Sequence, residues 1–118
     1  MEMKTQMENK LEIALEAIRN TKGENTIIYD FTSLNPFVDK VVITSASNMR
    51  QVYALASNIR EKCREHGFEV KMEGNQDSRW VLVNLEEVIV HVFLDEERDV
   101  YRLERLYGDL PKVEGYDL

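Results

Sequence analysis

The chain has 118 residues, of which 43% are hydrophobic and 31% are charged, and its formal net charge is −7. This length supports one hydrophobic core and excludes two independent domains. The acidic balance disfavours binding to a bare phosphate backbone and predicts a basic partner, with at most minor contact to RNA.

The cysteine content and the N-terminus bear on the compartment. A single cysteine, Cys63, excludes an internal disulfide and a cysteine-rich metal site, which favours a reducing compartment. Residues 1–10 are polar, and no later apolar run approaches the ~20 residues of a membrane span. We therefore expect a cytoplasmic protein that is neither secreted nor embedded in a membrane.

The first part of the chain predicts one helix and two strands. A helical apolar pattern ends before Gly23 and is formed by Met7, Leu11, Ala14, Leu15 and Ile18. Residues 26–31 are β-branched and aromatic, which predicts a strand, and a loop containing Pro36 follows. Residues 40–44 are apolar in their middle and predict a central strand that is covered on both faces.

The middle of the chain predicts a second helix and three strands. An apolar stripe marks a helix from Met49 to His66 and Gly67, and residues 68–72 alternate like a half-buried strand. Residues 79–85 and 88–94 predict two strands joined at Glu86 and Glu87. This connection lacks the glycine that a two-residue hairpin prefers.

A last helix and a tail complete the predicted fold. Asp95 is expected to cap this helix, which buries Val100, Leu103 and Tyr107 and ends at Gly108. The order α-β-β-α-β-β-β-α predicts an α+β fold, a five-stranded mixed sheet flanked by helices. The second and third strands should be parallel, joined by a right-handed crossover, with hairpins elsewhere. We expect one domain over residues 1–108 and an irregular tail over 109–118.

The sequence offers little support for catalysis or for a cofactor. The five glycines lie far apart and form no phosphate-binding loop, and the cysteine and histidines do not cluster as zinc ligands. A polymerase-type site needs two alternating carboxylates, but no second acid follows Asp30. Cys63 lies on an apolar helix stripe, which favours a buried, inert thiol over a nucleophile.

His91 and the large aromatic residues are the candidates for a contact surface. His91 interrupts an apolar strand and is either a hydrogen-bonded, half-buried imidazole or part of such a surface. Trp80, Tyr101 and Tyr107 are either core residues or anchors for a protein partner. Arg98, Arg102 and Arg105 lie at helical spacing among acidic residues, which favours a solvated, ion-paired face over a phosphate site.

An ordered set of short motifs resembles the ribosomal silencing factor family, also called Iojap-like. The motifs are Arg-Gln-Val at residues 50–52, Glu-Gly at 73–74, Trp-Val-Leu at 80–82, Val-His-Val-Phe at 90–93 and Arg-x-x-Tyr-x-Leu-Glu at 98–104. The resemblance covers nearly the whole chain. It departs from the family at residues 44–47, Thr-Ser-Ala-Ser in place of Thr-Gly-Thr-Ser, and at Tyr107, where the family often has tryptophan.

The resemblance implies a nucleotidyltransferase-like fold without catalytic carboxylates, and no enzymatic activity. It implies a repressor that binds the large ribosomal subunit through ribosomal protein L-fourteen and sterically blocks association with the small subunit. The partner-binding residues that it implies are Trp80, His91, Arg98, Tyr101, Glu104 and Tyr107. The alternatives are a metal-dependent nucleotidyltransferase-like enzyme, which would use Asp30 or Asp39 with His91, and a homodimeric scaffold.

Overall fold

The computed structural model describes residues 2–116 and, within the first helix, side chains from Lys10 onward. The side chain of Met7 therefore lies outside the described residues. The elements are α1 (Glu2–Asn20), β1 (Glu24–Asp30), β2 (Lys40–Ala46), α2 (Met49–Glu65), β3 (Lys71–Glu73), β4 (Trp80–Asn84), β5 (Val88–Leu94), α3 (Asp95–Tyr101) and α4 (Leu103–Leu106).

The strands form one mixed sheet in the order β1-β2-β5-β4-β3. Neighbouring strands are antiparallel except for β2 and β5, which pair in parallel from Lys40 opposite Val88 to Ala46 opposite Leu94. The predicted five-stranded mixed sheet is confirmed. The sequence prediction left the strand order open: β5 and β4 lie between β2 and β3, the two strands that α2 connects.

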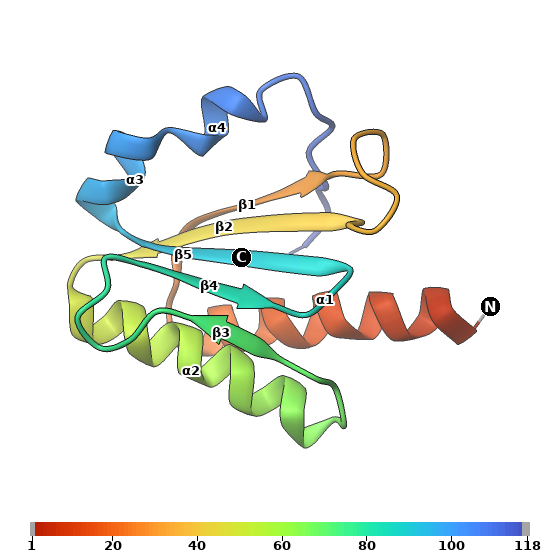
Figure 1. The fold of residues 1–118 in the computed structure, drawn as a ribbon, viewed down its shortest axis with the longest axis horizontal. Coiled ribbons are helices and arrows are strands. Elements are labelled where there is room, and N and C mark those ends of the chain that lie inside the picture. Colours follow the sequence, from red (N-terminus) through yellow and green to blue (C-terminus); the bar gives the residue numbers. More distant parts are fainter. Residues whose placement is uncertain (1, 117–118) are drawn as a thin grey trace.

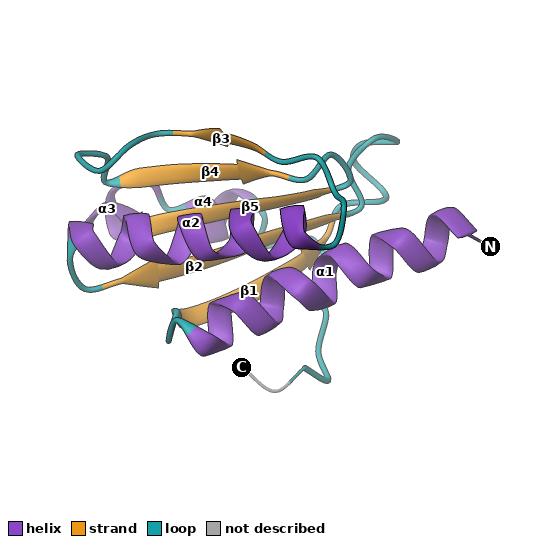
Figure 2. Cartoon of the chain, turned by 90° about the horizontal axis from the view of Figure 1, so that it is seen from below, coloured by secondary structure: helices purple, strands orange, loops and turns teal. Residues whose placement is uncertain are grey.

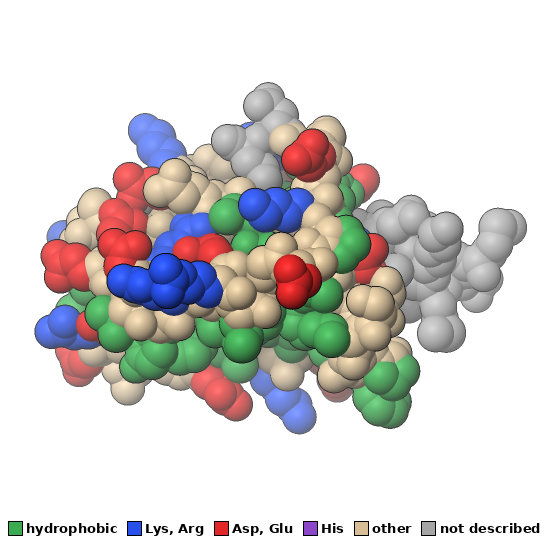
Figure 3. All heavy atoms as spheres, turned by 90° about the horizontal axis from the view of Figure 1, so that it is seen from above, with side chains coloured by type: hydrophobic (Ala, Val, Ile, Leu, Met, Phe, Trp, Pro, Cys, Tyr) green, Lys and Arg blue, Asp and Glu red, His purple; other side chains and the backbone are tan. Residues whose placement is uncertain are grey.

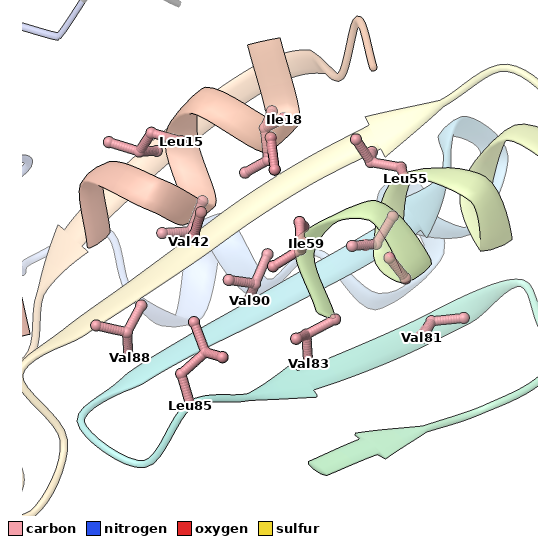
Figure 4. Close-up of a cluster of buried hydrophobic side chains, with 14 of the residues drawn as sticks. Leu15, Ile18, Val42, Leu55, Ile59, Val81, Val83, Leu85, Val88 and Val90 are labelled. Atoms are coloured by element: carbon pink, nitrogen blue, oxygen red, sulfur yellow. The ribbon is translucent and has the colours of Figure 1, made fainter. Parts of the chain in front are cut away.

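Helices α1 and α2 pack side by side on one face of the sheet, as Figures 1 and 2 show. The main core lies between them and that face, and Figure 4 shows Ile59 of α2 beside Val90 of β5. Val42 is also part of this core, whereas its neighbours Val41 and Ile43 are buried on the opposite face. Strand β2 is therefore covered on both sides, as its apolar centre predicts.

Helices α3 and α4 lie over the opposite face (Figure 1). A second cluster forms there around Tyr29, Ile43 and Phe93, and Leu103 and Tyr107 pack against it. The prediction of a single last helix is wrong, because Arg102 takes a left-handed conformation with φ of 51° and separates α3 from α4. The chain turns at this residue, which directs Leu103 and Tyr107 toward the sheet and leaves Val100 69% exposed.

The other predicted turns differ from the structure only in detail. The hairpin between β4 and β5 forms without glycine, since Glu86 takes a φ of 74° and its N–H donates to the side chain of Asn84 at 2.7 Å. Asp95 does not cap α3; it lies in the first turn, and Leu94 occupies the cap position without a side-chain hydrogen bond.

The C-terminal segment lies along the outer edge of β1. The N–H of Asp30 donates to the carbonyl of Pro111, and the N–H of Val113 donates to the carbonyl of Ile28, both at 2.8 Å. These bonds cover the edge of β1, which would otherwise present unpaired backbone groups. None of the described helices is long and apolar enough to span a bilayer.

Candidate functional site

Part of the sheet face that carries α3 and α4 is left without a helix over it. The outward-facing side chains of β4 and β5 in this part are half-buried and include Trp80, Leu82, Ile89 and His91. We call these four residues the open face. A hollow of about 410 Å³ lies on it, lined by Glu73, Gly74, Trp80, Leu82 and His91.

Trp80 is held in one orientation by three neighbours. Its indole stacks on Phe93 with 4.8 Å between ring centroids, and the ring of Tyr101 lies 4.7 Å away. The indole N–H donates to Nδ1 of His91 at 3.1 Å. Because the strand pairing places Trp80 opposite Phe93 and Leu82 opposite His91, the backbone itself brings these rings together.

His91 presents a neutral imidazole to the hollow. Burial lowers the pKa of His91 to about 4. Since Nδ1 accepts the indole proton of Trp80, we assign the imidazole proton to Nε2. The structure confirms that the imidazole of His91 is hydrogen-bonded and half-buried. The ring also lines the open hollow, and its part in a contact surface stays a prediction.

Arg98 and Glu104 form an ion pair in which Arg98 is buried and Glu104 is half-buried. The guanidinium of Arg98, a residue only 8% exposed, donates through Nε to Glu104 at 3.0 Å. Its Nη1 donates to Oγ of Ser45 at 3.1 Å and to the carbonyl of Glu24 at 3.4 Å. Arg98 is therefore not on a common solvated face with Arg102, whose Nε donates to the carbonyl of Asp99.

Tyr107 lies apart from the open face, on the side of β1. Its ring makes edge contacts with Tyr29 and Phe31, at centroid distances of 5.5 and 4.9 Å. Burial raises the pKa of its phenol above the usual value. Of the six residues that the family resemblance implies, the structure brings Trp80, His91 and Tyr101 together. It pairs Arg98 with Glu104 and packs Tyr107 elsewhere.

Several apolar side chains are exposed although the sequence does not predict it, among them Val100, which is expected to be buried. Val100 and Leu106 are exposed on α3 and α4 near Tyr101, which is itself 51% exposed. Leu34 and Phe37 are exposed in the loop between β1 and β2. The one available signal in the sequence was a phenylalanine next to Pro36 in a polar, turn-forming stretch.

The groups considered for catalysis are not assembled into a site. Asp30 aligns with Lys40 and Val88 at the end of the sheet, three residues along β5 from His91, and accepts two hydrogen bonds from Thr32. Cys63 is buried, and its burial raises the pKa of the thiol to about 11, as expected for an inert core residue. No cluster of three potential metal ligands occurs among the side chains that the structure describes, those of residues 10–116.

Comparison with known proteins identifies close relatives over most of the chain. The family model described as "Ribosomal silencing factor during starvation" matches residues 4–118. The ribosomal silencing factor RsfS of Bacillus subtilis is 39% identical over 102 residues, which are 86% of each chain. That of Halalkalibacterium halodurans is 36% identical over 105 residues, 88% of this chain and 90% of the relative.

Solved structures agree with this similarity. A crystal structure of a protein from Bacillus halodurans superposes with a TM-score of 0.81 at 32% identity and covers 92% of this chain and 99% of its own. A crystal structure of a protein from Chromobacterium violaceum has the same TM-score at 31% identity, with 94% and 92% covered.

Proposed function

The chain belongs to the ribosomal silencing factor family, and we propose that it binds the large ribosomal subunit through ribosomal protein L-fourteen and blocks joining of the small subunit. The family is one of ribosome-associated regulators rather than of enzymes. The proposed action is repression of translation in the cytoplasm, and it does not require the protein to catalyse a reaction.

The observation that carries the proposal is the aromatic pair of Trp80 and Tyr101, whose rings are in contact. Tyrosine and tryptophan dominate the energetics of protein interfaces because they bury a large area at a small cost in side-chain entropy. Trp80 is already fixed by Phe93 and by its hydrogen bond to His91, so little conformational freedom is lost on binding. Tyr101 adds an exposed ring at 4.7 Å from the indole.

The charge of the chain supports a basic protein as the partner. A net charge of −7 disfavours phosphate backbones and favours approach to basic ribosomal proteins. Steric exclusion requires only that the patch which the protein occupies on the large subunit overlap the surface that contacts the small subunit. A typical interface occupies roughly 800 Å² on each partner, which a domain of this size can provide.

The double variant Trp80→Ala with Tyr101→Ala tests the proposal. We expect it to bind purified large subunits at least about tenfold more weakly and to lose suppression of subunit joining on a sucrose gradient, because both anchors are removed. Tyr116→Ala is the matched control, since Tyr116 is a partly exposed tyrosine that follows the segment paired with β1.

Circular dichroism would confirm that both variants are folded. Unchanged affinity of the folded double variant would exclude the open face as the docking surface. A second copy of the chain is the competing occupant of this face. Sedimentation equilibrium of the chain alone distinguishes it, because a dimer formed through the open face would dissociate in the double variant.

A further inference from the structure

The loop between β1 and β2, residues 31–39, presents Phe37 to solvent in an ordered conformation. The N–H of Phe37 donates to the side chain of Asn35 at 2.8 Å, and the N–H of Phe31 donates to the carbonyl of Asp39 at 2.8 Å. The loop is tied to the hairpin of β4 and β5 through a 2.8 Å bond from Asp39 to the carbonyl of Glu87. Despite this order, Phe37 is 81% exposed.

Phe37 borders a second hollow on the same face of the sheet. This hollow has a volume of about 410 Å³ and is lined by Phe37, Val38, Glu69, Lys71, Asn84, Glu86, Glu87 and Ile89. Ile89 belongs to the open face, so the two hollows adjoin across β4 and β5. Figure 3 shows hydrophobic side chains gathered in a band along this side of the molecule, beside the part covered by α3 and α4.

The charges around this hollow indicate which class of molecule it can bind. Glu69 and Glu86 form no ion pair with any described residue, whereas Glu87 is paired with Lys10 at 2.7 Å. Lys71 is the one cation among the lining residues. The excess of carboxylates repels phosphate groups and attracts lysine and arginine. The apolar walls of Phe37, Val38 and Ile89 accommodate an apolar side chain.

We propose that the Phe37 hollow is a second docking site, which takes a basic protein segment of the large subunit carrying an apolar side chain. This inference rests on the proposed function. Ile89 and Phe93, which Trp80 covers, lie four residues apart on β5, a separation of about 13 Å. One anchoring side chain cannot fill both places, so the Phe37 hollow receives a different side chain from the one at Trp80 and Tyr101.

Photo-crosslinking to purified large subunits tests the site directly. In the variant Phe37→benzoylphenylalanine, the crosslinked product should be a lysine- or arginine-rich peptide of a ribosomal protein. Leu34→benzoylphenylalanine is the matched control, because Leu34 is 62% exposed on the same loop but does not line the hollow. Crosslinks to RNA alone, or equal yields from both positions, would overturn the proposal.

Affinity measurements provide a second test. Phe37→Ser should weaken binding to large subunits about tenfold, whereas Leu34→Ser should leave it nearly unchanged. The pair Glu69→Gln and Glu86→Gln should slow association and reduce its dependence on salt. Unchanged affinity of Phe37→Ser would overturn the second site.

Tyr101→benzoylphenylalanine separates this inference from the proposed function. If position 101 crosslinks to the subunit and position 37 does not, only the second site is wrong. If neither position crosslinks and the protein does not sediment with large subunits, the proposed function fails and this inference fails with it.

Discussion

At the scale of single residues, burial and one hydrogen bond of His91 determine the charge of this ring and the orientation of Trp80. Its ring orients Trp80 by accepting the indole proton, and burial keeps it neutral. Protonation at Nδ1 would remove this hydrogen bond and place a charge in a partly desolvated site. The aromatic anchor is therefore most ordered where His91 is unprotonated.

This arrangement predicts a loss of stability in acid. The pKa of His91 is about 4 in the folded chain and 6.5 in the unfolded chain, so below pH 6.5 the unfolded chain binds a proton that the folded chain does not. The free energy of unfolding should fall between pH 6.5 and about 4, by up to about 3 kcal/mol from this residue. Urea denaturation at a series of pH values measures the change.

Two variants isolate the contribution of His91. In His91→Gln the decline over this pH range should be shallower, whereas His66→Gln should retain the decline of the unmodified protein, since His66 is exposed at the C-terminal cap of α2. Asp30 and Glu87, whose carboxyl pKa values are lowered, contribute to the acid loss in all three proteins and cancel in the comparison. Parallel curves for all three would contradict the assignment.

At the scale of elements, Arg98 connects α3 and α4 to strands β1 and β2. Its guanidinium joins α3 to Glu104 of α4, to Ser45 of β2 and to the backbone of β1 at Glu24. Tyr101 lies at the end of α3, between Arg98 and the left-handed Arg102. Arg98 therefore fixes the position of Tyr101, and the direct contact with a partner that the family resemblance implies for Arg98 stays a prediction.

Removing this guanidinium should destabilise the fold. Arg98→Ala removes one donor from Oγ of Ser45 and one from the carbonyl of Glu24, which also accepts from Thr44, and it leaves the carboxylate of Glu104 without its cation. This change should cost about 2–3 kcal/mol of unfolding free energy. Arg105→Ala, at an exposed position, should change it by less than about 0.5 kcal/mol. Urea denaturation measures both.

A double-variant cycle tests the pairing itself. Arg98→Ala should cost less stability when Glu104 is already alanine, because part of the lost interaction is then absent. An equal cost in both backgrounds would mean that the ion pair between Arg98 and Glu104 contributes nothing to holding α4.

At the scale of the whole molecule, the acidic charge should govern encounter with the ribosome. The charge of −7 attracts basic protein surfaces, and salt screens this attraction over a Debye length of about 10 Å at 0.1 M. The association rate with purified large subunits should therefore fall several-fold between low and high potassium chloride, with a smaller change in the dissociation rate. Stopped-flow fluorescence of Trp80 would record both rates.

Sucrose at matched viscosity is the control for diffusion. An association rate that is constant or rises with salt would show that attraction between unlike charges does not steer the encounter. Such a result would also remove the electrostatic argument for a basic partner at the open face.

The sequence was informative wherever structure depends on near neighbours along the chain. Helices α1 and α2, four of the five strands and the buried Cys63 follow from local apolar periodicity, whereas β3 spans Lys71–Glu73 instead of the predicted 68–72. The sequence predicted where α1 ends, but it only partly predicted why the helix ends there. Lys22, not Gly23, takes the left-handed conformation, with φ of 59°, and a Cβ on Gly23 would lie 2.6 Å from the side chains of Ile18 and Thr44.

The family could also be recognised from the sequence, and the family model matches residues 4–118. Recognition was possible because the order of short motifs is a property of the sequence and does not depend on tertiary contacts. Tertiary structure alone decided the strand order, the break at Arg102, the burial of Arg98 against Ser45 and Glu24, and the hollow beside Phe37. Each depends on contacts between segments distant in sequence, and periodicity carries no information about which distant segments meet. For the same reason, Trp80 and Tyr101 could be named from the sequence, but their contact with each other could not.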